Sequence, residues 1–260
     1  MAEAQAKIAL LSVARDTESQ SHKPGPYGFE ISESCDTCNL TANGFYCKLP
    51  VAALKDFSAV QSVSVYPKGA LLFMEKQSSH GIFMLCGGQV KLSVSTSESK
   101  RLILRIANAG DVLGMMAVLA GTSYEATAET YRPCQVAYVR RGDFLRFIAD
   151  HPEAYPGIVK QLSSSYARAC EQLRNVASSA SAQERVGRLL LEWSKETKWG
   201  NQITLPLTQE EIGELIGVSR ETVTRALSQL RDHRLIVRKG VTLTIPDRAA
   251  LASFVTDCRW

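Results

Sequence analysis

The sequence lacks the marks of a membrane protein, a secreted protein or a common enzyme. No window approaches 18 consecutive apolar residues, the length that a membrane-spanning helix needs. The apolar run near the N-terminus is short and has charges on both sides, so we expect no signal peptide and a cytoplasmic location. The motifs H-E-x-x-H, G-x-G-x-x-G, G-x-S-x-G and the Walker loop are missing. We therefore expect a protein that is not an enzyme and has no membrane partner.

The composition is that of a globular protein. The chain has 260 residues, of which 45% are hydrophobic and 22% charged, which is enough for two modest domains. A net charge of +4 allows a polyanionic partner but does not require one. Seven cysteines, an odd number spread over a long chain, do not indicate a secreted disulfide framework. In a reducing compartment, clustered thiols favour metal binding or redox chemistry.

The chain divides into four regions, and together they predict an α+β protein. Residues 1–30 are polar and read as a flexible segment. Residues 31–148 hold the clustered cysteines and short strands separated by glycine turns, which predict a sandwich, jelly roll or small barrel. Two alternating runs, GIFMLCGGQVKLSVS and KRLILRIANAG, are expected to pair as a hairpin. In it, Val90, Leu92 and Val94 would lie opposite Leu102, Leu104 and Ile106.

Residues 149–182 predict a dimerisation helix. Apolar residues recur there at alternating steps of three and four, the 3.5-residue repeat of a coiled-coil seam. A helix that packs on its own β domain is the alternative, but so strict a stripe favours a second copy of the chain. The stripe consists of Val159, Leu162, Tyr166, Ala169, Leu173, Val176 and Ala180, and the first six are the expected dimer interface.

Residues 183–260 carry the most specific pattern, PLTQEEIGELIGVSRETVTRALSQLRDHRLIVRKGVTLTIPD. It predicts a helix, a tight turn, a second helix and a β-hairpin wing. Thr208 and Glu211 have the spacing of a capping box, Gly217 supplies the turn, and Ser219 caps the second helix. The expected buried face consists of Ile212, Leu215, Ile216, Val218, Val223, Ala226, Leu227 and Leu230.

The polar face of the second helix is the candidate DNA-reading surface. Arginine can bind guanine O6 and N7, and glutamate can accept from cytosine N4. A solvent-exposed ion pair is the alternative, because Glu221 and Arg225 are four residues apart. The order of cap, turn, charged face and wing favours DNA binding. The candidate base-contacting residues are Ser219, Arg220, Glu221, Thr224 and Arg225, and Arg238 and Lys239 at the wing tip are candidates for phosphates.

In this order the three parts resemble the CRP/FNR superfamily of bacterial transcription regulators, over roughly residues 50–255. VSRETVTRAL is the most specific segment, and it is similar to the R-E-x-x-x-R pattern of the cyclic-nucleotide branch, on Arg220, Glu221 and Arg225. The resemblance implies a cyclic-nucleotide-binding-like jelly roll and a homodimer that binds a palindrome in double-stranded DNA. It also implies half-sites closer to TGTGA than to TTGAT, and a contact with RNA polymerase.

The resemblance stops short of the cyclic-nucleotide site. Members that bind the nucleotide carry a G-E-L turn and an Arg-Ser pair that holds the phosphate. Here the turn reads Gly114-Met115-Met116, and the Arg-Ser position falls at about Tyr124-Glu125. A buried phosphate needs a cationic partner, and a carboxylate near it would repel it. We therefore expect that cAMP is not the effector.

The cysteines indicate a different signal. Cys35, Cys38 and Cys47 lie within thirteen residues, one thiolate short of a tetrahedral metal site. FNR-type oxygen sensors place three cysteines before the β domain and a fourth within it, and together these hold a [4Fe–4S] cluster. The resemblance implies Cys134 as the fourth ligand, although the second cysteine gap is longer here than is usual in the family. Cys86, just before Gly87-Gly88, is the rival.

Several functions remain open at this point. The first is a DNA-binding regulator that is controlled by oxygen, nitric oxide or redox state through an iron–sulfur cluster. The second is a regulator of the same family with no metal, which responds to an unknown ligand or is constitutive. Zinc or a thiol switch could also use the cysteines, because thiolates suit several soft metals. Their role could also be purely structural, since free cysteine is often a buried core residue. An electron carrier or metal-dependent enzyme is the option from another class, and the missing motifs argue against it.

Overall fold

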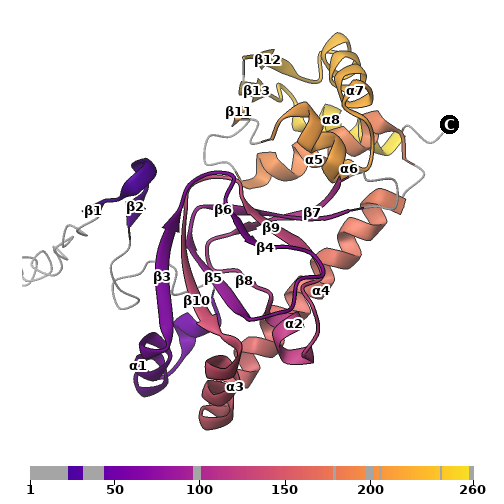
Figure 1. Ribbon diagram of the computed structural model, residues 1–260. Helices are drawn as coiled ribbons and strands as arrows, with labels where there is room; N and C mark the ends of the chain where they lie inside the picture. The colour runs from indigo at the N-terminus through magenta and orange to yellow at the C-terminus, as the bar shows by residue number, and fades with distance from the viewer. Residues whose placement is uncertain are drawn as a thin grey trace, which may run out of the picture.

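The computed structural model describes residues 23–31, 44–95, 101–177, 180–196, 202–204, 207–240 and 242–257. Figure 1 shows two bodies, a β-roll and a smaller helical domain, with the long helix α4 (Tyr155–Ala177) running beside the roll towards the helical domain. Within these ranges no helix is long and apolar enough to cross a membrane. The predicted α+β class and the order of the parts are confirmed.

The roll consists of two four-stranded antiparallel sheets. One has the order β3-β10-β5-β8 and the other the order β4-β9-β6-β7. Consecutive strands alternate between the two sheets, except that β6 and β7 pair with each other in the second sheet. The strands are β3 (Gln61–Tyr66), β4 (Leu71–Phe73), β5 (Gly81–Gly87), β6 (Gln89–Ser95), β7 (Arg101–Asn108), β8 (Val112–Leu113), β9 (Thr127–Thr130) and β10 (Cys134–Arg140).

The hairpin of β6 and β7 is confirmed, but the expected pairing holds only for Val94 and Leu102, because Leu92 and Val90 pair with Arg105 and Ala107. Ile103 and Ala107 are fully buried, whereas Leu102, Leu104 and Ile106 are half-buried. A bulge between Leu92 and Ser93 shifts the register, and an extra residue on one strand reverses which side chains face inward. The loop that joins these strands, 96–100, lies outside the described residues.

The sensor region contains more helix than the sequence pattern predicted. The helices α1 (Val51–Ala59), α2 (Met115–Ala120) and α3 (Arg141–Asp150) accompany the strands. The apolar residues of α3, Phe144, Phe147 and Ile148, have helical spacing and are buried in the cluster that also contains Phe57 of α1. Short helices inside a β-rich region are easily read as loops, because each spans only two or three turns.

The N-terminal region is more ordered at its end than expected. Two short strands, β1 (Lys23–Pro24) and β2 (Glu30–Ile31), pair antiparallel around the turn η1 (Pro26–Gly28). The ring of Phe29 occupies the space next to Gly87 that a Cβ there would need. This contact anchors residues 23–31 to the end of β5.

The expected single helix up to Ala180 is wrong. α4 ends at Ala177, and a second helix, α5 (Ala182–Glu196), begins after Ser181. The Ser181 hydroxyl accepts a hydrogen bond from the Glu184 backbone N–H at 3.3 Å and contacts the Glu184 carboxylate. Ser181-x-x-Glu184 is a helix-start signal inside the apparently continuous pattern, and it explains why Ala180 lies outside α4.

The helix-turn-helix and wing are confirmed. α6 (Gln209–Ile216) and α7 (Arg220–Asp232) are followed by the hairpin of β12 (Val237–Lys239) and β13 (Thr242–Thr244). A third strand, β11 (Gln202–Thr204), completes the sheet, and α8 (Arg248–Asp257) packs on α5. Residues from α5, α6, α7, β13 and α8 share one buried core, and α6 lies against β7 of the roll (Figure 1).

Candidate functional site

The polar face of α7 is exposed and its N-terminus is capped as expected. The Ser219 hydroxyl accepts from the Thr222 backbone N–H at 3.3 Å, and Gly217 ends α6 in the left-handed conformation with φ 72°. Arg220, Glu221, Thr224 and Arg225 are all exposed, while Val223, Ala226, Leu227 and Leu230 are buried beneath them. α7 therefore presents its charged face to solvent.

Local hydrogen bonds orient that face. The Thr224 hydroxyl donates to the Gln209 side-chain oxygen of α6 at 2.7 Å, which ties the two helices together. Arg225 Nη2 donates to the Thr222 hydroxyl at 3.3 Å. Hydrogen bonds from its own backbone N–H and from Ser219 lower the pKa of Glu221, so this residue is an ionised acceptor at neutral pH. A charged acceptor between two arginines can read a G·C pair in the major groove.

The wing carries its two basic residues on an exposed hairpin. Arg238 and Lys239 are exposed in β12. Arg238 Nε donates to the Gly240 carbonyl at 3.0 Å, and Gly240 has a φ of 61°, the left-handed conformation that suits a tight turn. The hairpin thus presents two positive charges within three residues of its tip, as a contact with a phosphate backbone needs.

The long helix α4 has one face on the roll and an apolar face in solvent. Ile158 and Gln161 are buried, and Arg168 and Gln172 form hydrogen bonds to the roll. The predicted seam lies on another face, where Val159, Tyr166 and Leu173 are 58%, 72% and 68% exposed. Leu162 is half-buried and Ala169 is exposed, and the side chain of Val176 lies outside the described residues. The alternative, that this stripe covers the chain's own β domain, is wrong for these three large residues.

Aromatic side chains occupy the position that the resemblance assigns to the nucleotide phosphate clamp. Tyr124 is buried, its ring stacks on Phe73 with centroids 4.1 Å apart, and its hydroxyl donates to the Gly81 carbonyl at 2.7 Å. Burial raises the pKa of Tyr124, so the phenol stays neutral. Gly114 lies against the Tyr124 ring, and Glu125 is exposed. No cation from these residues can hold a phosphate there.

The two rival ligand candidates within the roll lie close to one turn. The Cys134 thiol is buried and donates to the carbonyls of Gln89 and Arg132 at 3.1 and 3.0 Å. Burial raises the pKa of Cys134. A Cβ at Gly88 would lie 2.7 Å from its sulfur, so Cys134 lies directly beneath the β5–β6 turn. Cys86 is half-buried at the end of β5 and adjoins the core cluster that contains Phe45.

The N-terminal cysteines are not open to the same description. Cys35 and Cys38 lie outside the described residues, as does the side chain of Cys47, whose backbone belongs to the short helix η3 (Tyr46–Lys48). In the described ranges, no three histidine, cysteine, aspartate or glutamate side chains form a group that could hold a metal ion. The ligand set therefore stays a prediction.

A cleft of about 370 Å³ separates η3 from the long helix. Phe45 and Lys48 line one side, and Lys160 and Arg168 of α4 line the other. Asp111, in the β7–β8 turn, accepts from Arg168 at 3.2 Å and from Arg105 at 2.6 Å. The segment that contains Cys47 thus lies beside α4. Sequence reasoning missed Asp111 and Arg168, because they are 57 residues apart in the chain.

Two family models match the chain. The Crp-like helix-turn-helix domain matches residues 184–254, and the Cyclic nucleotide-binding domain matches residues 63–151. Curated relatives include the cAMP-activated global transcriptional regulator CRP of Salmonella typhimurium, 27% identical over 187 residues, which are 69% of this chain and 87% of the relative. The CRP-like cAMP-activated global transcriptional regulator of Mycobacterium tuberculosis is 26% identical over 193 residues, 72% and 85% of the two chains.

Solved structures share the fold. FixK2 from Bradyrhizobium japonicum has a TM-score of 0.65 at 23% identity, and the match covers 75% of this chain and 96% of that one. The c-di-GMP responsive regulator CLP from Xanthomonas campestris has a TM-score of 0.68 at 20% identity, with coverage of 75% and 99%. Each of these matches covers three quarters of this chain.

Proposed function

Since the chain belongs to the CRP/FNR family of DNA-binding transcription regulators, we propose that it binds a palindromic DNA site as a homodimer and contacts RNA polymerase from there. Regulators of this family are dimers that bind DNA and RNA polymerase, and its characterised relatives regulate transcription rather than catalyse a reaction. The observation that carries the proposal is the capped, exposed polar face of α7, with Arg220, Glu221 and Arg225 turned away from a shared core.

The exposed stripe of α4 supports the homodimer. Val159, Tyr166 and Leu173 follow one another at seven-residue intervals and are more than half exposed in a single chain. Apolar residues at that spacing fit a parallel helix pair. Two subunits joined along α4 can present their α7 helices to successive major grooves, about 34 Å apart.

A DNA-binding assay with matched arginine variants tests the proposal. A duplex would be selected from a random library with the wild-type protein and then used in gel shifts. We expect Arg220→Ala and Arg225→Ala to lose about 1–3 kcal/mol of discrimination for the selected half-site. Arg231→Ala is the matched control, because Arg231 is exposed at the other end of the same helix. Full specificity in Arg225→Ala would refute the assigned role.

We also propose that cAMP is not the effector of this chain. The curated relatives above are cAMP-activated, but the resemblance puts Tyr124 at about the position of the phosphate-binding arginine, and the Tyr124 ring stacks on Phe73. An uncompensated phosphate in such a site would be very costly. Calorimetric titration with cAMP should show no binding at concentrations that saturate the relatives.

For the signal, we propose a [4Fe–4S] cluster held by Cys35, Cys38, Cys47 and Cys134, with Cys86 as the rival fourth ligand. The ring of Phe29 lies on Gly87, and the sulfur of Cys134 lies beneath the adjoining Gly88. From Phe29 to Cys35 an extended chain can reach roughly 20 Å. Cys134 is therefore within reach of the cysteine segment, which supports the proposed ligand set. Four thiolates are a donor set that suits iron–sulfur clusters or zinc.

When bound, such a cluster would supply reactivity towards oxygen and nitric oxide. The chain's own residues offer a route from that region to the dimer. Phe45, two residues before Cys47, lies so close to Gly157 of α4 that a Cβ there would be 2.9 Å from the Phe45 Cβ. Arg168 of α4 in turn holds Asp111 of the β7–β8 turn. A change in the cysteine segment would therefore act on the first turns of the dimerisation helix.

Anaerobic purification separates the proposed cluster from its competitors. We expect a brown protein with acid-labile sulfide, and loss of both the colour and the sulfide in Cys134→Ser. A colourless protein with bound zinc would indicate a zinc or thiol switch, and a metal-free protein that binds DNA would indicate an effector-independent regulator. If Cys86→Ser loses the cluster and Cys134→Ser keeps it, the rival is the ligand.

A further inference from the structure

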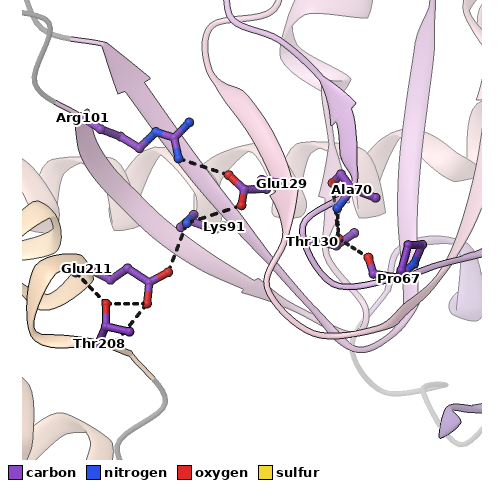
Figure 2. Close-up of polar contacts among 8 residues, drawn as sticks. All are labelled: Pro67, Ala70, Lys91, Arg101, Glu129, Thr130, Thr208 and Glu211. Atoms are coloured by element: carbon purple, nitrogen blue, oxygen red, sulfur yellow. Dashed lines mark hydrogen bonds and ion pairs between the residues drawn. The ribbon is translucent and has the colours of Figure 1, made fainter. Parts of the chain in front are cut away.

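The outer face of the sheet that contains β9, β6 and β7 carries a buried lysine. It forms ion pairs with a carboxylate of its own domain and with a carboxylate of the DNA-binding domain. Lys91 of β6 is 6% exposed. Its ammonium nitrogen lies 3.7 Å from Glu129 Oε1 on the neighbouring strand β9 and 3.2 Å from Glu211 Oε1 of α6 (Figure 2). Arg101 of β7 binds the other oxygen of Glu129 at 3.1 Å. A buried ammonium is tolerated only with such partners, so this lysine requires both carboxylates.

Glu211 has two roles at once. Its Oε2 accepts hydrogen bonds from the backbone N–H and the hydroxyl of Thr208, each at 3.0 Å, which completes the cap of α6. Its Oε1 faces Lys91 across the domain junction, as Figure 2 shows. Burial alone would raise the pKa of Glu211, but the hydrogen bonds from Thr208 and Lys91 outweigh it and the pKa lies below its usual value. The carboxylate that starts the helix-turn-helix therefore also joins it to the sensor sheet.

A further carboxylate, that of Glu214, lies near Lys91 at the domain junction. Glu214, one turn along α6, has a buried carboxylate oxygen with no hydrogen-bond partner in the described parts of the chain. Burial raises the pKa of Glu214, and the charges of Lys91 and Arg101 oppose that rise. Two carboxylates thus lie within 4 Å of the buried lysine, and the Glu214 carboxylate lies close enough to be influenced by its charge. Without Lys91, Glu129 of the sensor domain would face Glu211 across the junction with no ammonium between them.

The junction fixes the direction of α7. Gln172 of α4 donates to the Ile103 carbonyl of β7 at 3.1 Å and to the Leu215 carbonyl of α6 at 2.6 Å. α6 and α7 form one rigid unit, because Gly213 lies so close to the Val218 carbonyl that a Cβ there would be 2.6 Å away. In Figure 1, α6 lies beside the roll, and α7 lies on the side of α6 that is away from the roll. The polar face of α7 therefore stays exposed while α6 contacts the sheet.

We propose that Lys91 is a positioning residue for DNA recognition: through Glu211 it holds α6, and with it α7, in a fixed direction on the sensor sheet. A fixed direction favours simultaneous binding of two half-sites, because less orientational freedom is lost on binding. The proposal rests on DNA binding by the dimer and is independent of the iron–sulfur cluster.

A double-mutant cycle on the full-length protein tests this role. Lys91→Met keeps the length of the side chain and removes the charge, whereas Glu211→Gln removes the interdomain charge but keeps a residue that can complete the capping box. The probe is the duplex that the wild-type protein selects from a random library. We expect Lys91→Met to weaken binding at least about fivefold, the lower end of coupling between sites. The Lys91→Met/Glu211→Gln double variant should be no weaker than Lys91→Met alone.

Hydrogen exchange gives a readout that a merely structural role would not move. In Lys91→Met the amides of α6 and β7 at the junction should exchange faster, while those of α7 and β5, inside each domain, should stay protected. Thr130→Val is the matched control. Thr130 is next to Glu129, and its hydroxyl donates to Pro67 and accepts from Ala70, both in the sensor domain (Figure 2), so its loss should leave DNA affinity unchanged.

Three results would overturn the proposal. The first is an unchanged DNA affinity in Lys91→Met, and the second is additive losses of affinity in the double-mutant cycle. The third is tighter DNA binding by Lys91→Met, which would mean that the docked arrangement inhibits binding. If Lys91→Met fails to fold, Glu211→Gln alone still tests the proposal. This variant retains the cap of α6, and its affinity for the selected duplex should fall. If the wild-type protein selects no duplex, the proposed function fails, and the exchange measurement still decides whether Lys91 holds the two domains together.

Discussion

Leu173→Ala should weaken dimerisation without lowering the stability of the single subunit. Leu173 is 68% exposed on α4 and belongs to none of the buried clusters of a single chain. Burying a whole leucine side chain contributes about 1.5–3 kcal/mol. Covering the two-thirds that are exposed here therefore contributes about 1–2 kcal/mol in each subunit. Both subunits lose it in Leu173→Ala, so the dimer should lose about 2–4 kcal/mol.

That loss corresponds to a dimer dissociation constant roughly 30- to 700-fold higher, because each 1.4 kcal/mol is a factor of ten. Sedimentation equilibrium over a range of protein concentrations would measure it. Thermal unfolding of the dilute variant should match the wild-type monomer, since Leu173 packs against little within its own chain. The higher dissociation constant should also weaken DNA binding at low protein concentration, with the affinity restored as the concentration rises.

Glu171→Ala is the matched control. Glu171 is exposed on the same turn of α4. Residues two positions apart on a helix do not share a face, so Glu171 lies off the seam that contains Leu173. Its replacement should leave the dissociation constant unchanged. If Leu173→Ala dimerises as tightly as the control, the dimer does not use this stripe, and the reasoning from helical periodicity is wrong.

Two further expectations concern the wing and the domain junction. Lys239→Ala should weaken binding to all sequences about equally and reduce the slope of log affinity against log salt by about one, because Lys239 is exposed at the wing and one phosphate contact is lost. Glu214→Gln should raise the stability at neutral pH, because burial disfavours the charged carboxylate more than a neutral amide. Because the folded state raises the pKa of Glu214, this carboxylate destabilises the protein above that pKa and no longer does so below its usual value of 4.5. The advantage of the variant in thermal unfolding should therefore disappear as the pH falls towards 4.

Local signals of the DNA-binding domain could be predicted because each depends on neighbours in the sequence. The capping box of Thr208 and Glu211, the left-handed Gly217 and the cap of Ser219 are all set by residues within three or four positions. The exposed face of α7 followed from helical periodicity alone. The same kind of signal was present at Ser181 and Glu184, but the apolar repeat of α4 obscured it.

The strand faces were harder to predict. Alternation assigns every second residue to the core only while the register is unbroken, and the bulge at Leu92 and Ser93 breaks it. Beyond it, Leu92 and Val90 pair with Arg105 and Ala107 in place of Leu104 and Ile106. A bulge has no reliable mark in a single sequence, so the pairing of the two strands could be foreseen and the buried face of the second could not.

Lys91 shows what sequence reasoning misses entirely. Within β6 it looks like an ordinary polar residue on the solvent side of an alternating strand, yet it is 6% exposed. Its partner Glu211 lies 120 residues away, in the other domain. Only the packing of α6 on the sheet brings the two together, and that packing depends on half-buried residues such as Ile106 and Tyr131, which contact the core of the DNA-binding domain.

One helix connects the proposed sensor region to the DNA-reading surface. At its beginning, Gly157 of α4 lies against Phe45, two residues before Cys47. At its other end, Gln172 bonds to the carbonyl of Leu215 in α6. On another face of the same helix, Tyr166 and Leu173 are exposed. Any shift of α4 must therefore change the dimer seam and the support of α6 together, because the same rigid helix carries both. If the chain dimerises along α4 as proposed, dimerisation and domain docking are coupled, and a variant such as Leu173→Ala should also increase hydrogen exchange at the junction of α6 and β7.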